Sequence, residues 1–393
     1  MSDFLKSPIH IKASGEILVS RIALSMGTSI LTAIASIYFH NIGLTDAAVG
    51  YVAALGSLLA IVFTMVAPYL LEKYSEIVIY VVSGILLSFA TIFLGLTKVV
   101  PVAIITYCLT NILLMFGGNA INIALKDTTS SKREFTNLQG IFGSLINFSW
   151  FVGPILGGLA LSQLGTRNTL LLSGGFIMIS AIIIVLLPIH VKGKRRVKLD
   201  TDPLANIKFY LSRKNLTIAY IQSLGVRLWW GYVWAFLPLF MLDNGYSPTS
   251  VGLVVGATQL PLFLFEFLTV KTVRFFGYRK IFATGFSLLT IASILMLIAN
   301  DIHVVIGVTI ACSLALSFLE PICELFVFDQ VDRHEEDMAY PTYYTSTFAG
   351  SLVAKLGIAV FISLFGARSS YAFLAFLFVF VTISALGIKP RRA

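Results

Sequence analysis

The chain has 393 residues, of which 57% are hydrophobic and only 12% are charged, and its formal net charge is +9. Soluble domains carry about 25% charged residues, so this composition excludes an ordinary soluble protein and predicts an integral membrane protein. The cysteines, Cys108, Cys312 and Cys323, lie in apolar stretches without metal-ligand spacing, so neither a disulfide framework nor a zinc site is expected.

Twelve stretches are long and apolar enough to cross a bilayer, for which a helix needs about 20 residues. In chain order they are 15–39, 47–71, 77–97, 100–124, 138–163, 168–190, 215–241, 249–271, 279–299, 302–328, 341–365 and 369–388. A polar segment follows the sixth stretch and contains the pattern of a short basic amphipathic helix. We therefore predict an all-α membrane protein with a six-helix bundle in 1–190, a linker in 191–214 and a second six-helix bundle in 215–393.

The basic residues predict the orientation of these spans. Most Lys and Arg residues, Arg21 among them, fall in or beside the tails and loops on one side, whereas the loops on the other side hold only Lys98, Arg167 and Arg368. Cytoplasmic loops are the ones enriched in positive charge, so both termini and the linker are expected in the cytoplasm of a cell that carries the chain in its plasma or inner membrane. The positive charge then faces the lipid head groups, and no nucleic-acid partner is expected.

The two halves of the chain repeat each other at an offset of 202 residues. NIGLTDAAVGYV (41–52) matches DNGYSPTSVGLV (243–254), with Gly43 on Gly245 and Gly50 on Gly252. Duplicated six-helix halves are typical of secondary transporters, in which the substrate site lies between the repeats.

The twelve spans, the long central linker and this repeat together resemble the major facilitator superfamily over essentially the whole chain. In the fifth span, Gly153, Pro154, Gly157 and Gly158 resemble the Gly-Pro-x-x-Gly-Gly motif that is most typical of the family's proton-coupled antiporters. Small residues that let two helices approach closely would give the same pattern.

The loop after the second span resembles a second family motif. It keeps an acid and a base in Glu72 and Lys73, and its repeat copy keeps Gly277 and Arg279 but has Arg274 where an acid is expected. The resemblance implies that these residues latch the two halves together on the cytoplasmic side.

Ionisable residues inside the spans of the second half are candidates for the transport site. They are Arg227, Glu266, Glu320, Glu324 and Lys355. The resemblance implies that their helices border a central cavity. A charge facing lipid is costly, so these side chains are expected to face one another or water.

Three interpretations of these charges remain open. In the first, Glu320 pairs with Lys355 in a static structural network. In the second, Glu320, with Glu324 and Glu266, binds and releases a proton during turnover as Glu320 moves relative to Lys355, because burial raises the pKa of a carboxyl group and a nearby cation lowers it. In the third, Arg227 and Lys355 hold an anionic group of the substrate. We favour the second and third together.

Aromatic and amide side chains complete the predicted substrate site. Trp230 and Trp234 follow Arg227 along the seventh span, and Asn119 and Asn147 lie in the fourth and fifth spans. Membrane-interface anchoring explains the tryptophans equally well, and helix–helix hydrogen bonding explains the amides equally well.

The function predicted from these patterns is secondary active transport of a small organic solute by alternating access, with proton coupling, an anionic substrate and a functional monomer. The alternatives are a proton-driven exporter of lipophilic compounds and a non-transporting sensor on the same fold. A membrane-embedded enzyme would need a paired nucleophile and base or a zinc motif inside a span, and the spans show neither. No cofactor is expected.

Overall fold

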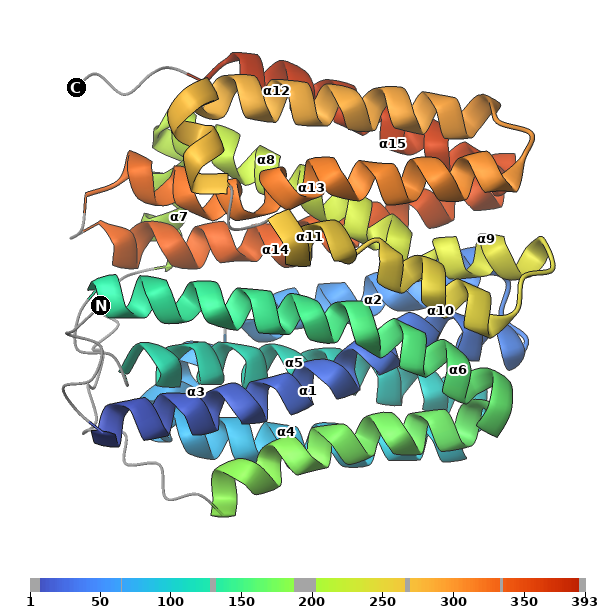
Figure 1. Ribbon diagram of the computed structural model, residues 1–393, viewed down its shortest axis with the longest axis horizontal. Coiled ribbons are helices and arrows are strands. Elements are labelled where there is room, and N and C mark those ends of the chain that lie inside the picture. The colour runs from blue at the N-terminus through green and yellow to red at the C-terminus, as the bar shows by residue number, and fades with distance from the viewer. Residues whose placement is uncertain are drawn as a thin grey trace.

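The computed structural model describes residues 8–64, 66–127, 132–186, 203–265, 269–332 and 335–388, and every regular element in these ranges is a helix (Figure 1). The helices are α1 (Pro8–Asn41), α2 (Asp46–Thr64), α3 (Ala67–Lys73), α4 (Glu76–Leu96), α5 (Val100–Asp127), α6 (Lys132–Leu186), α7 (Pro203–Ser212), α8 (Lys214–Ala235), α9 (Leu237–Asp243), α10 (Pro248–Ala257), α11 (Leu260–Phe265), α12 (Thr269–Ile298), α13 (Ile302–Gln330), α14 (Glu336–Phe365) and α15 (Ser369–Leu386).

Eleven segments of the described chain are long and apolar enough to cross a membrane. One of them, Phe142–Leu186, has 45 residues and would be about 68 Å long as a straight helix, roughly twice the hydrocarbon thickness. It turns back at Gly165, whose φ of 76° and ψ of 171° suit glycine alone. Split at this residue, the segment supplies two spans, so the all-α fold class with twelve spans is confirmed.

Proline residues interrupt two of the predicted spans. The span 215–241 is divided into α8 and α9 beside Pro238, and the span 249–271 is divided into α10 and α11 beside Pro261. Proline lacks the N–H that continues a helix, and such breaks are tolerated in a membrane where neighbouring helices cover the backbone.

The helices gather in two groups (Figure 1). Helices α1–α6, here called the N half, form the lower group, and α8–α15, called the C half, form the upper group. The start of α1 and the end of α15 lie at one end of the molecule, called the terminal end, and the opposite end is called the far end. The short helix α7 packs against α14 of the C half.

The two halves meet closely at the far end, where α6 of the N half packs on α10 of the C half. A Cβ atom on Gly252 would overlap the carbonyl oxygen of Pro154, and a Cβ on Gly158 would overlap that of Pro248. A Cβ on Gly256 would lie 2.6 Å from the carbonyl oxygen of Phe151. Backbone therefore touches backbone across this seam, and the far end is closed.

Hydrogen bonds between side chains reinforce the closed far end. The hydroxyl groups of Tyr51 and Ser363 lie 2.8 Å apart, and Thr249 Oγ1 donates to Ser162 Oγ at 2.9 Å. Both pairs join the N half to the C half.

Candidate functional site

The central charged pair joins α8 to α13. Arg227 Nη2 lies 3.0 Å from Glu320 Oε1, and the indole Nε1 of Trp230 donates to Glu320 Oε2 at 2.9 Å. Both oxygens of this carboxylate are therefore engaged, one by a cation and one by a neutral donor. Buried carboxylates are stable only with such compensation.

A proline shapes the helix beside this pair. Pro321 follows Glu320 inside α13 and has no N–H to offer the carbonyl oxygen of Ser317 one turn earlier. Thr269 Oγ1 donates to that carbonyl instead, at 3.4 Å. The helix thus continues through the proline with its free carbonyl satisfied.

Water reaches the central pair even though it lies deep in the membrane-spanning helices. The side chain of Arg227 is 32% exposed and that of Glu320 is 28% exposed. Both side chains of the pair are therefore in contact with solvent although they lie within membrane-spanning helices.

Tyrosine side chains of α14 surround the second acid of the cluster. Tyr340 and Arg227 both lie close enough to Glu324 to act on its carboxyl group. Tyr344 lies within electrostatic range of Arg227 and Glu324 as well. Glu324 is therefore surrounded by these side chains and belongs to the same charged cluster as Arg227.

Lys355 does not pair with Glu320, and this interpretation of the sequence is wrong for the conformation described. Lys355 Nζ donates to Ser57 Oγ of α2 at 3.1 Å, and Ser57 Oγ lies 3.2 Å from Ser351 Oγ. The cation that faces Glu320 is Arg227. The face of α14 that carries Lys355 is turned toward the N half, so its ammonium group crosses the seam between the halves.

Arg21 is a further candidate site residue that the sequence analysis missed by counting it with the basic residues of the membrane surface. It lies on α1 and interacts electrostatically with Tyr80 of its own half and with Tyr344 of the C half. Its Nε atom is buried and has no hydrogen-bond partner among the described residues. The signal was present in the sequence, because Arg21 stands between the apolar runs ILV and IAL.

An indole contact also crosses the seam. The rings of Trp150 on α6 and Trp234 on α8 have centroids 4.8 Å apart, and Trp234 and Trp230 follow at 6.2 Å. Trp230 in turn donates to Glu320. Aromatic side chains thus run from the N half to the charged pair, and the predicted residues Trp230 and Trp234 lie beside it.

The predicted amides lie in the N half. Asn119 Nδ2 donates to Met115 Sδ on its own helix at 3.4 Å, which is a contact within α5 and not with the charged cluster. Asn147 is half-buried on α6, one turn before Trp150.

The glycine motif of the fifth span works as a packing surface. A Cβ on Gly153 would overlap the hydroxyl of Ser29 on α1, and one on Gly157 would lie 3.4 Å from Ile34 of the same helix. Gly158 faces the C half, as described above. The motif therefore joins α6 to α1 on one side and to α10 on the other.

The residues of the predicted cytoplasmic latch are described only in part. The side chain of Glu72 and the whole of Glu266 lie outside the described residues. Lys73 is exposed, with its Nζ 5.6 Å from the ring centroid of Tyr74. Gly277 has a φ of 72° and forms the turn that precedes the exposed Arg279.

Removing the hydroxyl group of Ser57 should lower the free energy of unfolding more than removing the hydroxyl group of Ser363. Both serines bond across the seam, but the partner of Ser57 is a half-buried ammonium group, whereas the Tyr51–Ser363 pair is exposed. Leaving a charged donor without its partner costs about 1–3 kcal/mol, and an exposed change costs less than about 0.5 kcal/mol. Thermal unfolding of Ser57→Ala and Ser363→Ala measures the difference. Equal losses in the two variants would contradict it.

Comparisons with known proteins agree with this architecture. The family model described as Major Facilitator Superfamily matches residues 17–231 and 219–393. An uncharacterized MFS-type transporter of Methanocaldococcus jannaschii is 21% identical over 376 residues, which cover 91% of this chain and 93% of that protein.

Solved transporter structures share the fold at low sequence identity. A nucleoside transporter, NupG, superposes with a TM-score of 0.76 at 10% identity and covers 97% of this chain and 99% of its own. A D-xylose–proton symporter superposes with a TM-score of 0.78 at 12% identity, and the match covers 97% of this chain and 98% of that one. A peptide transporter of the POT type, in complex with sulfate, superposes with a TM-score of 0.77 at 12% identity, and the match covers 98% of this chain and 94% of that one.

The family model covers both repeats, and the fold matches transporters over nearly the whole chain. This multi-pass membrane protein is therefore a transporter rather than an enzyme, and the chain belongs to the Major Facilitator Superfamily.

Proposed function

We propose that this chain is a secondary active transporter that moves a small organic anion by alternating access and couples its movement to protons. The observation that carries the proposal is the Arg227–Glu320 pair, which joins two membrane-spanning helices of the C half and is nevertheless about one-third exposed to water. An intramembrane ion pair that water can reach is the expected property of a transport site.

The charges of the candidate site favour an anionic substrate. The site contains three cations, Arg21, Arg227 and Lys355, whereas its described acids are Glu320 and Glu324. Arg21 and Lys355 have no salt bridge among the described residues. Buried cations are normally paired, so a substrate carboxylate or phosphate supplies the missing negative charge.

Proton coupling follows from competition for Arg227. A substrate anion that binds the guanidinium group draws it from Glu320, and the carboxylate, now without its cation, takes up a proton. Release of the substrate returns Arg227 to Glu320 and expels the proton. The D-xylose–proton symporter supports this proposal to the extent that the same fold carries proton symport in that protein.

The halves are proposed to move as the units 1–190 and 215–393, with the terminal end in the cytoplasm and one chain as the functional unit. The described end of the linker, 203–214, is attached to the C half, since Arg213 Nη1 donates to Glu335 Oε2 at 2.8 Å. The described conformation is then open to the cytoplasm and closed outside.

A second candidate is a proton-driven exporter of lipophilic compounds. The Trp150–Trp234–Trp230 contact series favours it, because indole rings beside an acid suit an apolar cation.

Thermal unfolding of the purified protein with a panel of organic anions, sugars and lipophilic cations tests the proposal. A ligand that binds the native state raises the apparent melting temperature. We expect stabilisation by anions in the parent and in Arg167→Ala, an exposed control, and its loss in Arg227→Ala. Stabilisation only by lipophilic cations, unchanged in Arg227→Ala, would favour the exporter. If no compound in the panel stabilises the protein or is transported by it, the result would favour the non-transporting sensor.

A further inference from the structure

The short helix α7 has one face packed against the C half and one face exposed. On the packed face, Asn206 and Tyr210 are only 7% and 0% exposed. On the other face, Ile207 and Leu211 are 39% and 57% exposed, although both are large and apolar. They stand four residues apart and therefore form one apolar stripe along the helix. Lys208 is exposed beside this stripe, so the outer face of α7 combines apolar side chains with a cation.

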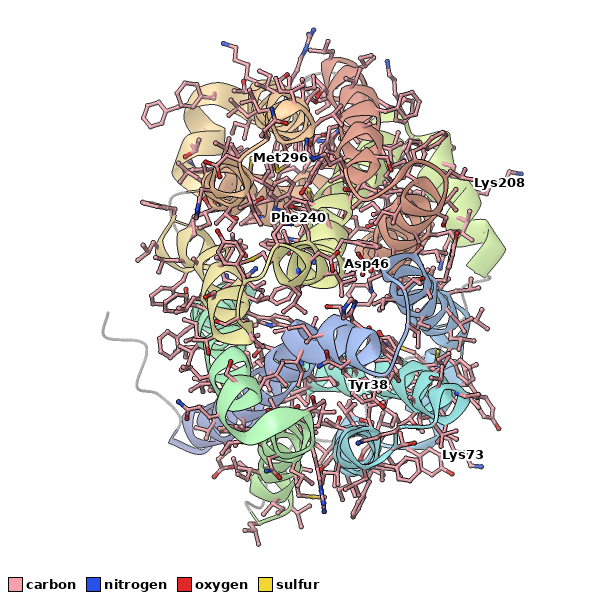
Figure 2. The ribbon with its side chains drawn as sticks, turned by 90° about the vertical axis from the view of Figure 1, so that its right-hand side faces the viewer. Tyr38, Asp46, Lys73, Lys208, Phe240 and Met296 are labelled. Carbon is pink, nitrogen blue, oxygen red and sulfur yellow. The ribbon has the colours of Figure 1, made fainter. Side chains whose placement is uncertain are left out.

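Helix α7 lies beside the membrane-spanning helices of the C half and not beyond their ends. The ring centroids of Tyr210 and Tyr220 are 6.3 Å apart, and Tyr220 lies six residues, or about 9 Å, along α8 from its first residue. Figure 2 looks along the membrane-spanning helices and shows Lys208 at the outer edge of the molecule, directed away from the bundle. The exposed face of α7 therefore meets lipid at the edge of the bilayer, on the side of the terminal end.

Contacts at the end of α7 fix the direction of this face. The guanidinium carbon of Arg213 lies 4.4 Å from the ring centroid of Phe209, and Arg213 Nη1 donates to Glu335 Oε2 at 2.8 Å. Thr217 Oγ1 of α8 donates to the carbonyl oxygen of Leu211 at 3.3 Å. The helix is thus attached at its end to α8 and to the turn before α14.

The chain around α7 is strongly basic. The segment VKGKRRVK (191–198) stands between α6 and α7 and has five Lys and Arg among its eight residues. Over the whole linker, 191–214, eight Lys and Arg stand against two Asp. Lys208 and Lys214 belong to this set and are exposed. Four to eight cations beside a membrane span or on an amphipathic helix attract anionic lipid head groups.

We propose that α7 and the basic segment 191–198 form a binding surface for anionic phospholipids. Ile207 and Leu211 enter the upper part of the acyl chains, and Lys208 binds the phosphate of a lipid head group. An apolar stripe alone would contact any bilayer, whereas the cations select negatively charged lipids. Because Arg213 ties α7 to the C half, the bound lipids hold this half at the head-group layer. The inference concerns the linker and does not depend on the substrate or on proton coupling.

Quenching of a fluorophore on α7 by labelled lipids tests this surface. Ser212→Cys places a bimane label at the exposed end of α7 in the full-length protein, whose three native cysteines are buried. The protein is placed in nanodiscs of phosphatidylcholine and phosphatidylglycerol in equal parts, and one of the two lipids carries a nitroxide quencher close to its head group. We expect labelled phosphatidylglycerol to quench more strongly than labelled phosphatidylcholine. Lys208→Gln should lower this preference about fivefold, the contribution of one cation near an anionic surface. Salt at about 0.5 M should weaken it through screening.

Lys280→Gln is the matched control, because Lys280 is also exposed in the C half but lies on α12, and this variant should keep the parental preference. Equal quenching by the two lipids would overturn the proposal, as would an equal loss of preference in Lys280→Gln and Lys208→Gln. Loss of the preference on addition of soluble glycerophosphate would also overturn it, in favour of a site for free phosphate compounds. None of these outcomes involves the substrate, so the lipid surface and the transport function are tested separately.

Discussion

Replacing Gly252 with valine should abolish transport by preventing the far end from closing. A side chain at this position meets the backbone of Pro154 and Gly158 in the opposite half, and backbone cannot turn aside as a flexible side chain can. Overpacking of this kind costs about 1–3 kcal/mol. The upper end of that range lowers the closed population about 100-fold relative to the open one.

Two measurements test this expectation. One is transport of an anion chosen by the thermal-unfolding screen. The other is the distance between spin labels on cysteines introduced at Lys98 and Asn300, which lie on exposed loops of the two halves at the far end. We expect Gly252→Val to show little transport and mainly the longer distance, while remaining folded. Gly307→Val is the matched control, since Gly307 also lies in a membrane-spanning helix and a Cβ there meets nothing within 4 Å. A Gly252→Val protein that transports at the parental rate with the short distance would show that this contact does not govern closure.

Glu320→Gln should separate substrate movement from the proton gradient. Glutamine keeps the shape of the side chain and one acceptor oxygen, which serves either Trp230 or Arg227, but it cannot gain or lose a proton at neutral pH. One proton per substrate supports at most about a tenfold accumulation for each unit of pH difference. The variant should lose this accumulation and retain exchange of substrate down its own gradient.

The paired control for this experiment is Glu324→Gln, which changes the neighbouring acid one helical turn after Glu320 and leaves the Arg227–Glu320 ion pair in place. Uptake into proteoliposomes with and without a pH difference distinguishes the two variants. Accumulation that survives in Glu320→Gln and disappears in Glu324→Gln would assign the coupling to Glu324 and contradict the mechanism proposed above.

The membrane-spanning helices could be predicted from the sequence because hydrophobic length is a local property. The predicted span 77–97 corresponds to α4 (Glu76–Leu96), and 302–328 corresponds to α13 (Ile302–Gln330). The split of α6 at Gly165 also follows from the sequence, since an apolar run of that length exceeds one crossing of the bilayer.

The partners of the charged residues could not be predicted, because they depend on how each helix is rotated and how far it lies from its neighbours. Glu320 and Lys355 lie on consecutive long helices, yet the rotation of α14 turns Lys355 to Ser57 of the other half. Asp46 and Asp243 come from separate halves, and the closed seam brings their carboxylate oxygens within 4.8 Å of each other. Arg21 was recognisable as a cation in an apolar run, but whether it faced the cavity depended on the packing of α1.

The positions of the tryptophans have a practical consequence. The chain has four tryptophans, and all of them lie either in α8 or opposite it on α6. The Trp150–Trp234 contact joins the two halves, and Trp230 donates its indole hydrogen to Glu320. Indole emission is sensitive to stacking and to nearby charge, so the intrinsic fluorescence of the unlabelled protein should report both the separation of the halves and the departure of the guanidinium group from Glu320. The protein thus carries its own optical probe of turnover.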